Sequence, residues 1–407
     1  MDLTEIRTLF PQLTASVNGR PLVYLDNAAT SLRPVSVIQK WEEMSSVKNS
    51  NIHRAVHATA LAATEEFEAA RKAVADFVGA LPEEIVFTSG TTHSLNLLAF
   101  CLGESGSFSS GDEILIVESE HHSNIVPWQL LAQRKNLKIN ILHVSDEGTI
   151  LLDTLRKALT EKTRLLCIAQ ISNVLGLINP IKEICDICHQ YGTKVMVDGA
   201  QSVAHLPVDV REMDCDYFAF SGHKMYAAPG TGILYGKRSL LENLPPYMGG
   251  GEMIDSVSWE KTTFAGVPQR FEAGTQNFAG VPTFVPAIEM VKLLRNNEIE
   301  QEYKGILRYV QKALTEDPDI QLFGTKTDPA KRIPLFSIAV KGAHHEDIAL
   351  ILDKMGVAVR SGQMCAEPLM TRFGVTGMLR ASFAPYNTLA EAEYFIESLH
   401  KAIRMLK

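Results

Sequence analysis

The feature that most constrains the fold is an alternation of apolar runs with helical patterns in the middle of the chain. Apolar runs such as EILIVE (113–118), TRLLCIAQIS (163–172) and KVMVDGA (194–200) are separated by helical patterns such as LLDTLRKALT (151–160) and IKEICDICHQYG (181–192). Apolar runs without polar alternation are typical of strands that are buried on both faces of a sheet. The pattern therefore predicts an α/β fold with a mainly parallel sheet, in which ligands bind beyond the carboxyl ends of the strands.

Beyond residue 280 the pattern changes. A long helical stretch over 281–316 is followed by strand-like runs at 333–340 and 357–362, with helical patterns after each. A single core stops growing beyond roughly 250–300 residues, so a chain of this length is expected to divide. The sequence predicts an N-terminal segment (1–20) that packs with the small domain, a large α/β domain (21–285) and a smaller α+β domain (286–407).

Charge and hydropathy exclude several classes of protein. The 407 residues carry a formal net charge of −8 and contain no basic block, which gives no support to a nucleic-acid or anionic-membrane partner. No run of about 18 apolar residues is present, so no membrane span is predicted. The first residues, MDLTEIRTLFPQLT, lack the apolar segment of a signal peptide. We therefore expect a cytoplasmic protein whose six cysteines stay reduced.

A lysine lies in a tight turn between two apolar runs. The run YFAF is followed by Ser221, Gly222, His223 and Lys224, and the apolar run GILYG begins a few residues later. A lysine this close to a core is costly unless its charge is paired or its amine is needed chemically. Taken alone, such a lysine is more often a surface residue. A desolvated amine, however, loses its proton more easily and becomes a nucleophile.

Other polar residues follow the neighbouring strand-like runs. The run KVMV ends at Asp198, Gln201 comes three residues later, and His121 follows EILIVE. The loop SGTT (89–92), directly before a helical pattern, offers N–H groups and hydroxyls that suit a phosphate. Singly these are ordinary structural residues. As an ordered set with Lys224, they match pyridoxal phosphate, which needs a phosphate site, a carboxylate at its ring nitrogen and a lysine for a Schiff base.

These blocks carry a family resemblance. The chain resembles the fold-type I pyridoxal-phosphate enzymes of the class V aminotransferase group, and among them the SufS-type (group II) cysteine desulfurases. The match runs from YLDNAAT (24–30) to RASFAPYNT (380–388), and between them lie NIHRAVH, SGTTHSLN, EHHSNIVPW, ISNVLG, VDGAQS, FSGHK, RFEAGTQN and RSGQMCAEP. The resemblance implies a seven-stranded sheet flanked by helices, a smaller α+β C-terminal domain, and a homodimer.

The resemblance also implies a role for each matching residue. It places the cofactor against Thr91, Thr92, His121, Asp198, Gln201, Ser221, His223 and Lys224, together with Thr275 from the neighbouring subunit. Lys224 forms the Schiff base and later moves protons at the substrate's Cα. Asp198 pairs with the pyridine nitrogen, and His121 stacks on the ring and assists the proton transfers. Arg380 binds the substrate's carboxylate, with Asn173 and Arg360 in the same pocket.

A second candidate nucleophile, Cys365, lies in RSGQMCAEP (360–368). A free cysteine is usually a small buried hydrophobe. The resemblance implies instead that its thiolate attacks the sulfur of cofactor-bound L-cysteine, which leaves a persulfide on Cys365 and releases L-alanine. The sulfur then passes to an acceptor protein for iron–sulfur cluster assembly. Where relatives commonly carry Gly-His-His before the cysteine, this chain has Gly362, Gln363 and Met364.

Several other functions use much of the same sequence. A selenocysteine lyase or a cysteine-sulfinate desulfinase needs the thiol less, a plain aminotransferase has no use for Cys365, and an inactive scaffold has no use for Lys224. The sequence CDICH (185–189) has the spacing of a c-type haem attachment site. Because it falls within a helical pattern, we interpret its cysteines as core residues and expect no haem or metal site.

Overall fold

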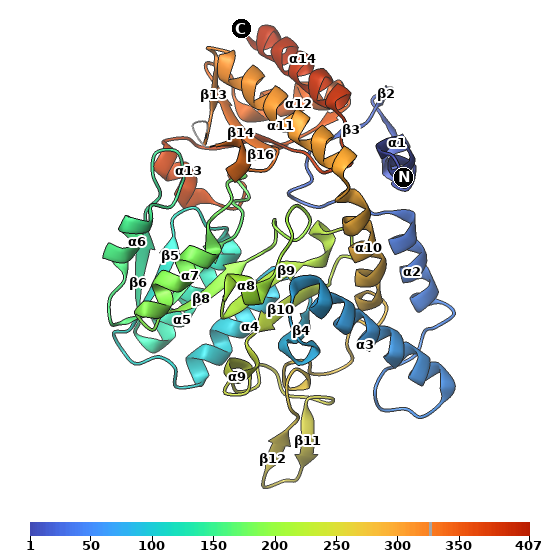
Figure 1. Cartoon of the computed structure of the whole chain (residues 1–407), viewed down its shortest axis with the longest axis vertical. Coiled ribbons are helices and arrows are strands. Elements are labelled where there is room, and N and C mark those ends of the chain that lie inside the picture. The colour runs from blue at the N-terminus through green and yellow to red at the C-terminus, as the bar shows by residue number, and fades with distance from the viewer. Residues whose placement is uncertain (325–327) are drawn as a thin grey trace.

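The computed structural model describes residues 1–324 and 328–407, and a seven-stranded sheet with the order β4-β10-β9-β8-β7-β5-β6 forms its centre (Figure 1). The strands are β4 (Ile85–Thr88), β5 (Glu113–Val117), β6 (Lys138–Leu142), β7 (Thr163–Ala169), β8 (Lys194–Asp198), β9 (Tyr217–Ser221) and β10 (Gly232–Gly236). Neighbouring strands are parallel except at β10, which is antiparallel to both β4 and β9. The predicted mainly parallel α/β sheet is therefore confirmed.

Helices cover both faces of this sheet (Figure 1). The helices α4 (Thr91–Glu104) and α5 (Val126–Lys135) contribute to one apolar core, and α3 (Ala58–Val78), α7 (Ile181–Gln190) and α10 (Phe284–Leu294) contribute to the other. In β8, Val195 and Val197 pack into the second core while Met196 packs into the first. Successive side chains of a strand point to opposite faces, so the continuous apolar runs of the sequence serve both cores.

A second, antiparallel sheet follows in the C-terminal part, with the order β13-β14-β17-β16. It consists of β13 (Ile320–Leu322), β14 (Leu335–Val340), β16 (Arg360–Gly362) and β17 (Met378–Ser382), and it packs with α11 (Asn297–Glu316), α12 (His345–Lys354) and α14 (Leu389–Leu406) (Figure 1). Val23 and Leu25 join its core because β3 (Val23–Tyr24) pairs with β15 (Val357–Ala358). The boundaries 1–20, 21–285 and 286–407 stay predictions.

The remaining elements connect these layers. They are α1 (Leu3–Thr8), β1 (Ser16–Val17), β2 (Arg20–Pro21), α2 (Val35–Ser45), α6 (Leu152–Ala158), α8 (Val210–Met213), α9 (Arg238–Leu241), the hairpin β11 (Ile254–Val257) and β12 (Thr262–Phe264), and α13 (Glu367–Phe373). The predicted long helix over 281–316 is two helices, because Asn296 accepts a hydrogen bond from Ile299 N and caps a new start. Within the described residues, every helix is too short or too polar to cross a bilayer.

Candidate active site

A cavity of about 230 Å³ opens at the carboxyl ends of the parallel strands. All but one of the sequence-predicted site residues line it. Those that do are Thr91, Thr92, His121, Asn173, Asp198, Gln201, Ser221, His223, Lys224, Arg360, Cys365 and Arg380. The exception is Thr275, which is exposed shortly after the 3-10 helix Gln269–Phe271. Its contribution to a neighbouring subunit stays a prediction. The fold therefore gathers distant segments of the chain at one edge of the sheet.

The amino end of α4 forms one end of the cavity. Ser221 Oγ accepts a hydrogen bond from Thr91 N at 2.8 Å, which ties the end of β9 to the start of this helix. A Cβ on Gly232 would lie 2.3 Å from the Cα of Gly90, and Gly90 has a φ of 151°, so the close passage of the two backbones requires glycine. The N–H groups of the first helical turn and the dipole of the helix favour an anion such as a phosphate here.

Lys224 lies half-buried in the turn that follows β9, with Asp198 at the end of the adjacent strand β8. Burial lowers the pKa of Lys224, while the Asp198 carboxylate acts in the opposite direction. Burial raises the pKa of Asp198, and Lys224 and a hydrogen bond from Ala200 N at 2.8 Å oppose that rise. The amine is thus made easier to deprotonate. The negative charge of the carboxylate is only partly compensated by the protein, so a cationic group of a ligand would stabilise it.

His121 lines the cavity as a neutral ring. Burial and the charge of Lys224 lower the pKa of His121 to about 3. Its Nδ1 accepts a hydrogen bond from Ser123 N at 3.0 Å, so the ring proton lies on Nε2. The next residue, His122, was not predicted to act. Its backbone N–H donates to the Cys365 carbonyl at 2.7 Å, and its Nε2 accepts from Glu367 N at 3.0 Å. His122 therefore anchors the loop that carries Cys365.

The segment YLDNAAT supports the cavity from the N-terminal side. Gln201 Nε2 donates to the Ala28 carbonyl at 2.8 Å. The ring of His223 lies with Nδ1 3.2 Å from Thr30 Oγ1, and Ser31 N donates to the His223 carbonyl at 3.1 Å. Burial, and then the charge of Lys224, lower the pKa of His223 to about 4. These contacts fix the turn around Lys224 against a segment far away in sequence.

Arg380 in β17 is buried and only partly satisfied by the protein. Its Nη1 donates to the Asn173 carbonyl at 2.8 Å, and its Nη2 pairs with Asp26 Oδ1 at 3.1 Å. Among the described residues, its Nε has no hydrogen-bond partner. Burial lowers the pKa of Arg380, although Asp26 opposes this effect. Arg360, which lies 4.0 Å from Asp26, adds a second cation to the same wall. This corner of the cavity suits a small carboxylate.

Cys365 differs from the chain's other cysteines, since it is exposed and the other five are buried. Met364 and Cys365 both have a φ of 54°, a left-handed conformation that non-glycine residues rarely adopt. Asn173 Nδ2 holds this turn by donating to the Met364 carbonyl at 2.9 Å. Gln363 Nε2 donates to Glu367 Oε1 at 3.3 Å. The loop therefore presents the thiol at the cavity wall in a fixed, strained conformation.

These residues fit pyridoxal phosphate. The amino end of α4 can hold the phosphate, and Lys224 can reach the aldehyde. A protonated ring nitrogen would supply the cation that the buried Asp198 carboxylate lacks. No group of three or more metal-ligating side chains occurs within residues 1–324 and 328–407. Cys185 and Cys188, the cysteines of CDICH, are buried in the apolar core beneath the sheet.

Comparison with known proteins defines the class. Residues 23–395 match the family model described as Aminotransferase class-V, and the chain belongs to this family. The chain is 42% identical over 407 residues, the full length of both chains, to a probable cysteine desulfurase of Vibrio cholerae. It is 43% identical over 406 residues to a cysteine desulfurase of Cronobacter sakazakii, and the match covers 99% of each chain.

Solved structures of the same fold agree with this assignment. The S-sulfonic acid form of cysteine desulfurase CsdA from Escherichia coli matches with a TM-score of 0.90 and 36% identity over 100% of both chains. The apo cysteine desulfurase of Thermococcus onnurineus NA1 matches with a TM-score of 0.93 and 35% identity, over 99% of this chain and 98% of that one. The predicted fold-type I architecture is therefore confirmed.

Proposed function

We propose that this chain is a pyridoxal-phosphate-dependent cysteine desulfurase, which converts L-cysteine to L-alanine and keeps the sulfur as a persulfide on Cys365. The observation that carries the proposal is the exposed Cys365, held in the wall of the cavity that also contains Lys224 and Arg380. The full-length similarity to cysteine desulfurases supports it. A plain aminotransferase offers no reason for a thiol at this position.

In this proposal the cavity residues divide into a cofactor side and a substrate side. The phosphate is held by Thr91, Thr92, Ser221 and His223, with Thr275 from the neighbouring subunit. Gln201 bonds the ring oxygen, and Asp198 keeps the ring nitrogen protonated. When bound, the cofactor withdraws electrons from the substrate's Cα. On the other side, the free Nε of Arg380 gives the guanidinium a donor for the substrate's carboxylate, and Asn173 and Arg360 line the same corner.

Lys224 and His121 handle the protons. The lowered pKa of Lys224 makes a neutral amine available to accept the Cα proton. His121 stays neutral at physiological pH because the pKa is lowered to about 3, and its Nε2–H can donate toward the cavity. A charged imidazolium beside Lys224 would raise the cost of protonating the amine. The neutral ring avoids this repulsion.

In the sulfur step Cys365 is the residue that takes up the sulfur, and the electron withdrawal that the bound cofactor would supply makes the carbon side of the bond able to leave. The Cys365 thiolate attacks the substrate's Sγ, an S–S bond forms, and the Cβ–Sγ bond breaks. Its electron pair stays with Cβ, which takes up a proton and becomes the methyl group of alanine. L-cysteine and the Cys365 thiol thus give L-alanine and the Cys365 persulfide without an external oxidant or reductant. Because Cys365 is exposed, a second protein can reach the terminal sulfur.

We further propose the SufS-type subgroup, a cytoplasmic homodimer, and a dedicated acceptor protein that takes the sulfur for iron–sulfur cluster assembly. The block order of the sequence and the rigid, strained loop around Cys365 support a docked acceptor, because the thiol cannot swing far. The proposed division into segment 1–20, domain 21–285 and domain 286–407 places Cys365 on the smaller domain, opposite Lys224 on the larger one.

The experiment measures alanine and sulfide from L-cysteine in the presence of a reductant, for the wild type and for Cys365→Ala. We expect the variant to keep its bound chromophore and lose sulfide release. Full-rate sulfide release by the variant would show that Cys365 carries no sulfur. The same assay with selenocysteine and cysteine sulfinate separates the lyase and desulfinase alternatives, which tolerate the loss of the thiol. A protein that stays colourless with added cofactor does not bind it, and this result would favour the alternative of an inactive scaffold.

A further inference from the structure

Among the described residues, a second cavity, of about 340 Å³, shares no lining residue with the active-site cavity. The end of α10 and the start of α11 form one side of it, the turn Ala204–Pro207 forms another, and residues 329–334 before β14 form a third. Its walls are mostly apolar, with Leu206, Leu294 and Ile333 among them. This volume falls in the range of ordinary small-molecule sites, roughly 300–1,000 Å³.

Arg332 lines this cavity and is buried, with 3% of its surface exposed. Its guanidinium donates only to backbone carbonyls, those of Gly324 at 2.9 Å, Leu175 at 3.3 Å and Leu335 at 2.9 Å. Among the described residues, its Nε has no partner. Burial lowers the pKa of Arg332 to about 10, and no charged neighbour opposes the effect. The positive charge is therefore buried without a counter-charge, which is costly.

Arg295 lines the same cavity. Its Nη2 donates to the carbonyls of Val203, at 3.0 Å, and Leu206, and its guanidinium carbon lies 5.4 Å from the centroid of the Phe77 ring. Within the described part of the chain, its Nε also lacks a partner. Burial lowers the pKa of Arg295 as well. Two guanidinium groups thus give one apolar cavity a net positive wall.

Elsewhere this chain supplies an acid to a buried guanidinium. Arg71 Nη1 lies 2.8 Å from Glu272, and Arg380 Nη2 lies 3.1 Å from Asp26. At the second cavity, the acid among the lining residues is Glu300, whose Oε1 pairs with the Lys304 ammonium at 2.5 Å. Among the described residues, Arg295 and Arg332 differ from these two arginines because no acid is paired with either of them, which points to an anion that comes from outside the chain.

We propose that this cavity binds a small organic monocarboxylate, with its hydrocarbon body against the apolar wall and its carboxylate on the side of Arg295 and Arg332. The apolar wall favours a hydrocarbon body over inorganic phosphate. The other polar groups add no charge. His205 Nδ1 lies 2.8 Å from the Tyr303 hydroxyl, and burial lowers the pKa of His205 to about 4. A singly charged anion matches this limited positive charge.

The site is independent of the proposed desulfurase chemistry, although it adjoins the active site. Ile178, on its wall, forms an isolated bridge with Ile171, which lines the first cavity. Leu177 pairs in the same way with Arg332. The loop that carries Asn173 therefore lies between the two cavities.

The test uses the holoenzyme and two probes of equal length, octanoate and 1-octanol, with binding measured by calorimetry. We expect octanoate to bind at least tenfold more tightly than 1-octanol. Arg295→Met should reduce this preference, because Arg332 is then the one guanidinium left in the lining, while 1-octanol still binds. Ala204→Phe, which fills the cavity, should remove both probes. Lys292→Met, an exposed lysine of α10 outside the lining of this cavity, is the matched control, and it should bind both probes as the wild type does.

Two results would overturn the proposal. One is equal affinity for octanoate and 1-octanol in the wild type, which would mean that the arginines attract no anion. The other is unchanged octanoate affinity in Ala204→Phe, which would place the carboxylate elsewhere, for example at Arg380. Because the probe comparison needs no substitution, the proposal remains testable even if Arg295→Met fails to fold. Neither result depends on whether the enzyme desulfurates L-cysteine.

Discussion

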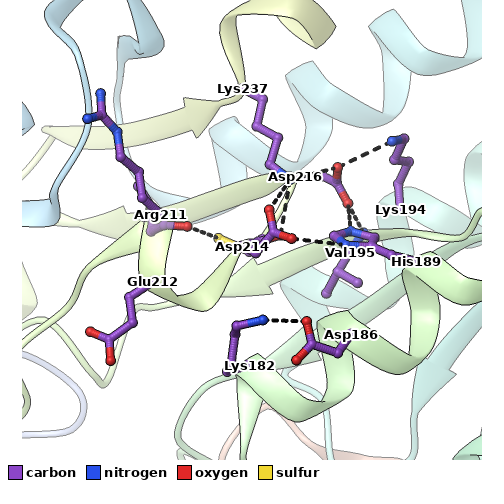
Figure 2. Close-up of polar contacts among 12 residues, drawn as sticks. Lys182, Asp186, His189, Lys194, Val195, Arg211, Glu212, Asp214, Asp216 and Lys237 are labelled. Carbon is purple, nitrogen blue, oxygen red and sulfur yellow. Dashed lines mark hydrogen bonds and ion pairs between the residues drawn. The ribbon is translucent and has the colours of Figure 1, made fainter.

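At the amino end of β9, the buried carboxylate of Asp216 is surrounded by partners, whereas at the carboxyl ends of the same strands Asp198 and Lys224 have few. Asp216 Oδ2 accepts from Val195 N at 2.8 Å and lies 2.9 Å from His189 Nε2, and the Lys194 and Lys237 ammonium groups lie 3.4 and 3.5 Å from Oδ1 (Figure 2).

The Asp198 carboxylate receives a single hydrogen bond among the described residues, from Ala200 N. Its pKa is raised and that of Lys224 is lowered, both mainly by burial. The same sheet therefore neutralises its buried charge at one edge and leaves it poorly compensated at the other. Buried charges without sufficient counter-charge indicate a ligand site, because the bound ligand can supply the missing counter-charge. We expect substitutions at the amino edge to change stability and those at the carboxyl edge to change activity.

The largest expected effect is on activity, at Lys224. Lys224→Ala should lower desulfuration by about 10²–10⁴-fold or more, because it removes the group that moves the Cα proton. Stability should not fall, since the amine has no ion-pair partner within 4.0 Å in the described structure. Steady-state assays and urea unfolding of the same preparation test both statements. Unchanged turnover would place the chemistry elsewhere in the cavity.

The next effect is on stability, at the amino edge. Asp216→Asn should lower the free energy of unfolding by about 3 kcal/mol, because His189, Lys194 and Lys237 lose their shared buried acid. Turnover per folded molecule should not change. Lys182→Ala, which removes the exposed ion pair with Asp186 in the same view (Figure 2), is the control and should have no measurable effect. Equal stability of the two variants would contradict the comparison.

Asp198→Asn should act with the opposite sign. In the protein without cofactor, replacing this buried, poorly paired carboxylate with an amide should raise the free energy of unfolding by about 1 kcal/mol. Added cofactor should then stabilise the wild type more than the variant, because the amide cannot pair with a protonated ring nitrogen. Chemical unfolding with and without cofactor measures both. A loss of stability in the cofactor-free variant would show that the Asp198 charge is already satisfied.

The dependence of folding stability on acid pH gives a further test of the comparison. The pKa values of His121, His205 and His223 are lowered to about 3, 4 and 4, mainly by burial, whereas an unfolded histidine titrates near 6.5. Below pH 6.5 the unfolded chain takes up protons that these folded rings do not bind, so stability is lost as the pH falls toward 4. Each ring should contribute about 1.4 kcal/mol per pH unit at most.

Unfolding at pH 7 and pH 5 measures this loss. We expect His223→Asn to reduce the difference between the two pH values, while His143→Asn, at an exposed position, leaves it as in the wild type. A wild type that is equally stable at both pH values would contradict the burial of neutral histidines at the carboxyl edge.

Much of the fold and of the cavity could be predicted from the sequence. Strands buried on both faces leave continuous apolar runs, and the carboxyl ends of parallel strands must meet. Lys224, Asp198 and His121 each follow such a run, so their convergence follows from topology alone. The two-face packing of β8 likewise follows from its unbroken apolar run.

The supporting contacts could not be predicted, because they join segments far apart in the sequence. His122 holds the backbone of Glu367, 245 positions away, and Asp26 pairs with Arg380, 354 positions away. Asp26 lies in the block YLDNAAT and His122 in EHHSN, yet the sequence around either residue does not predict which distant residue it contacts. The left-handed turn at Met364 and Cys365 is also invisible in sequence, since neither residue is glycine.

The most direct measurement is the mass of the peptide that contains Cys365 after the holoenzyme has been mixed with L-cysteine, without reductant, and then alkylated. The account predicts that this peptide gains the mass of one sulfur atom, that one alanine appears per modified site, and that the gain is absent in Lys224→Ala. Alanine formation without added sulfur at Cys365, or added sulfur on a different cysteine, would contradict it.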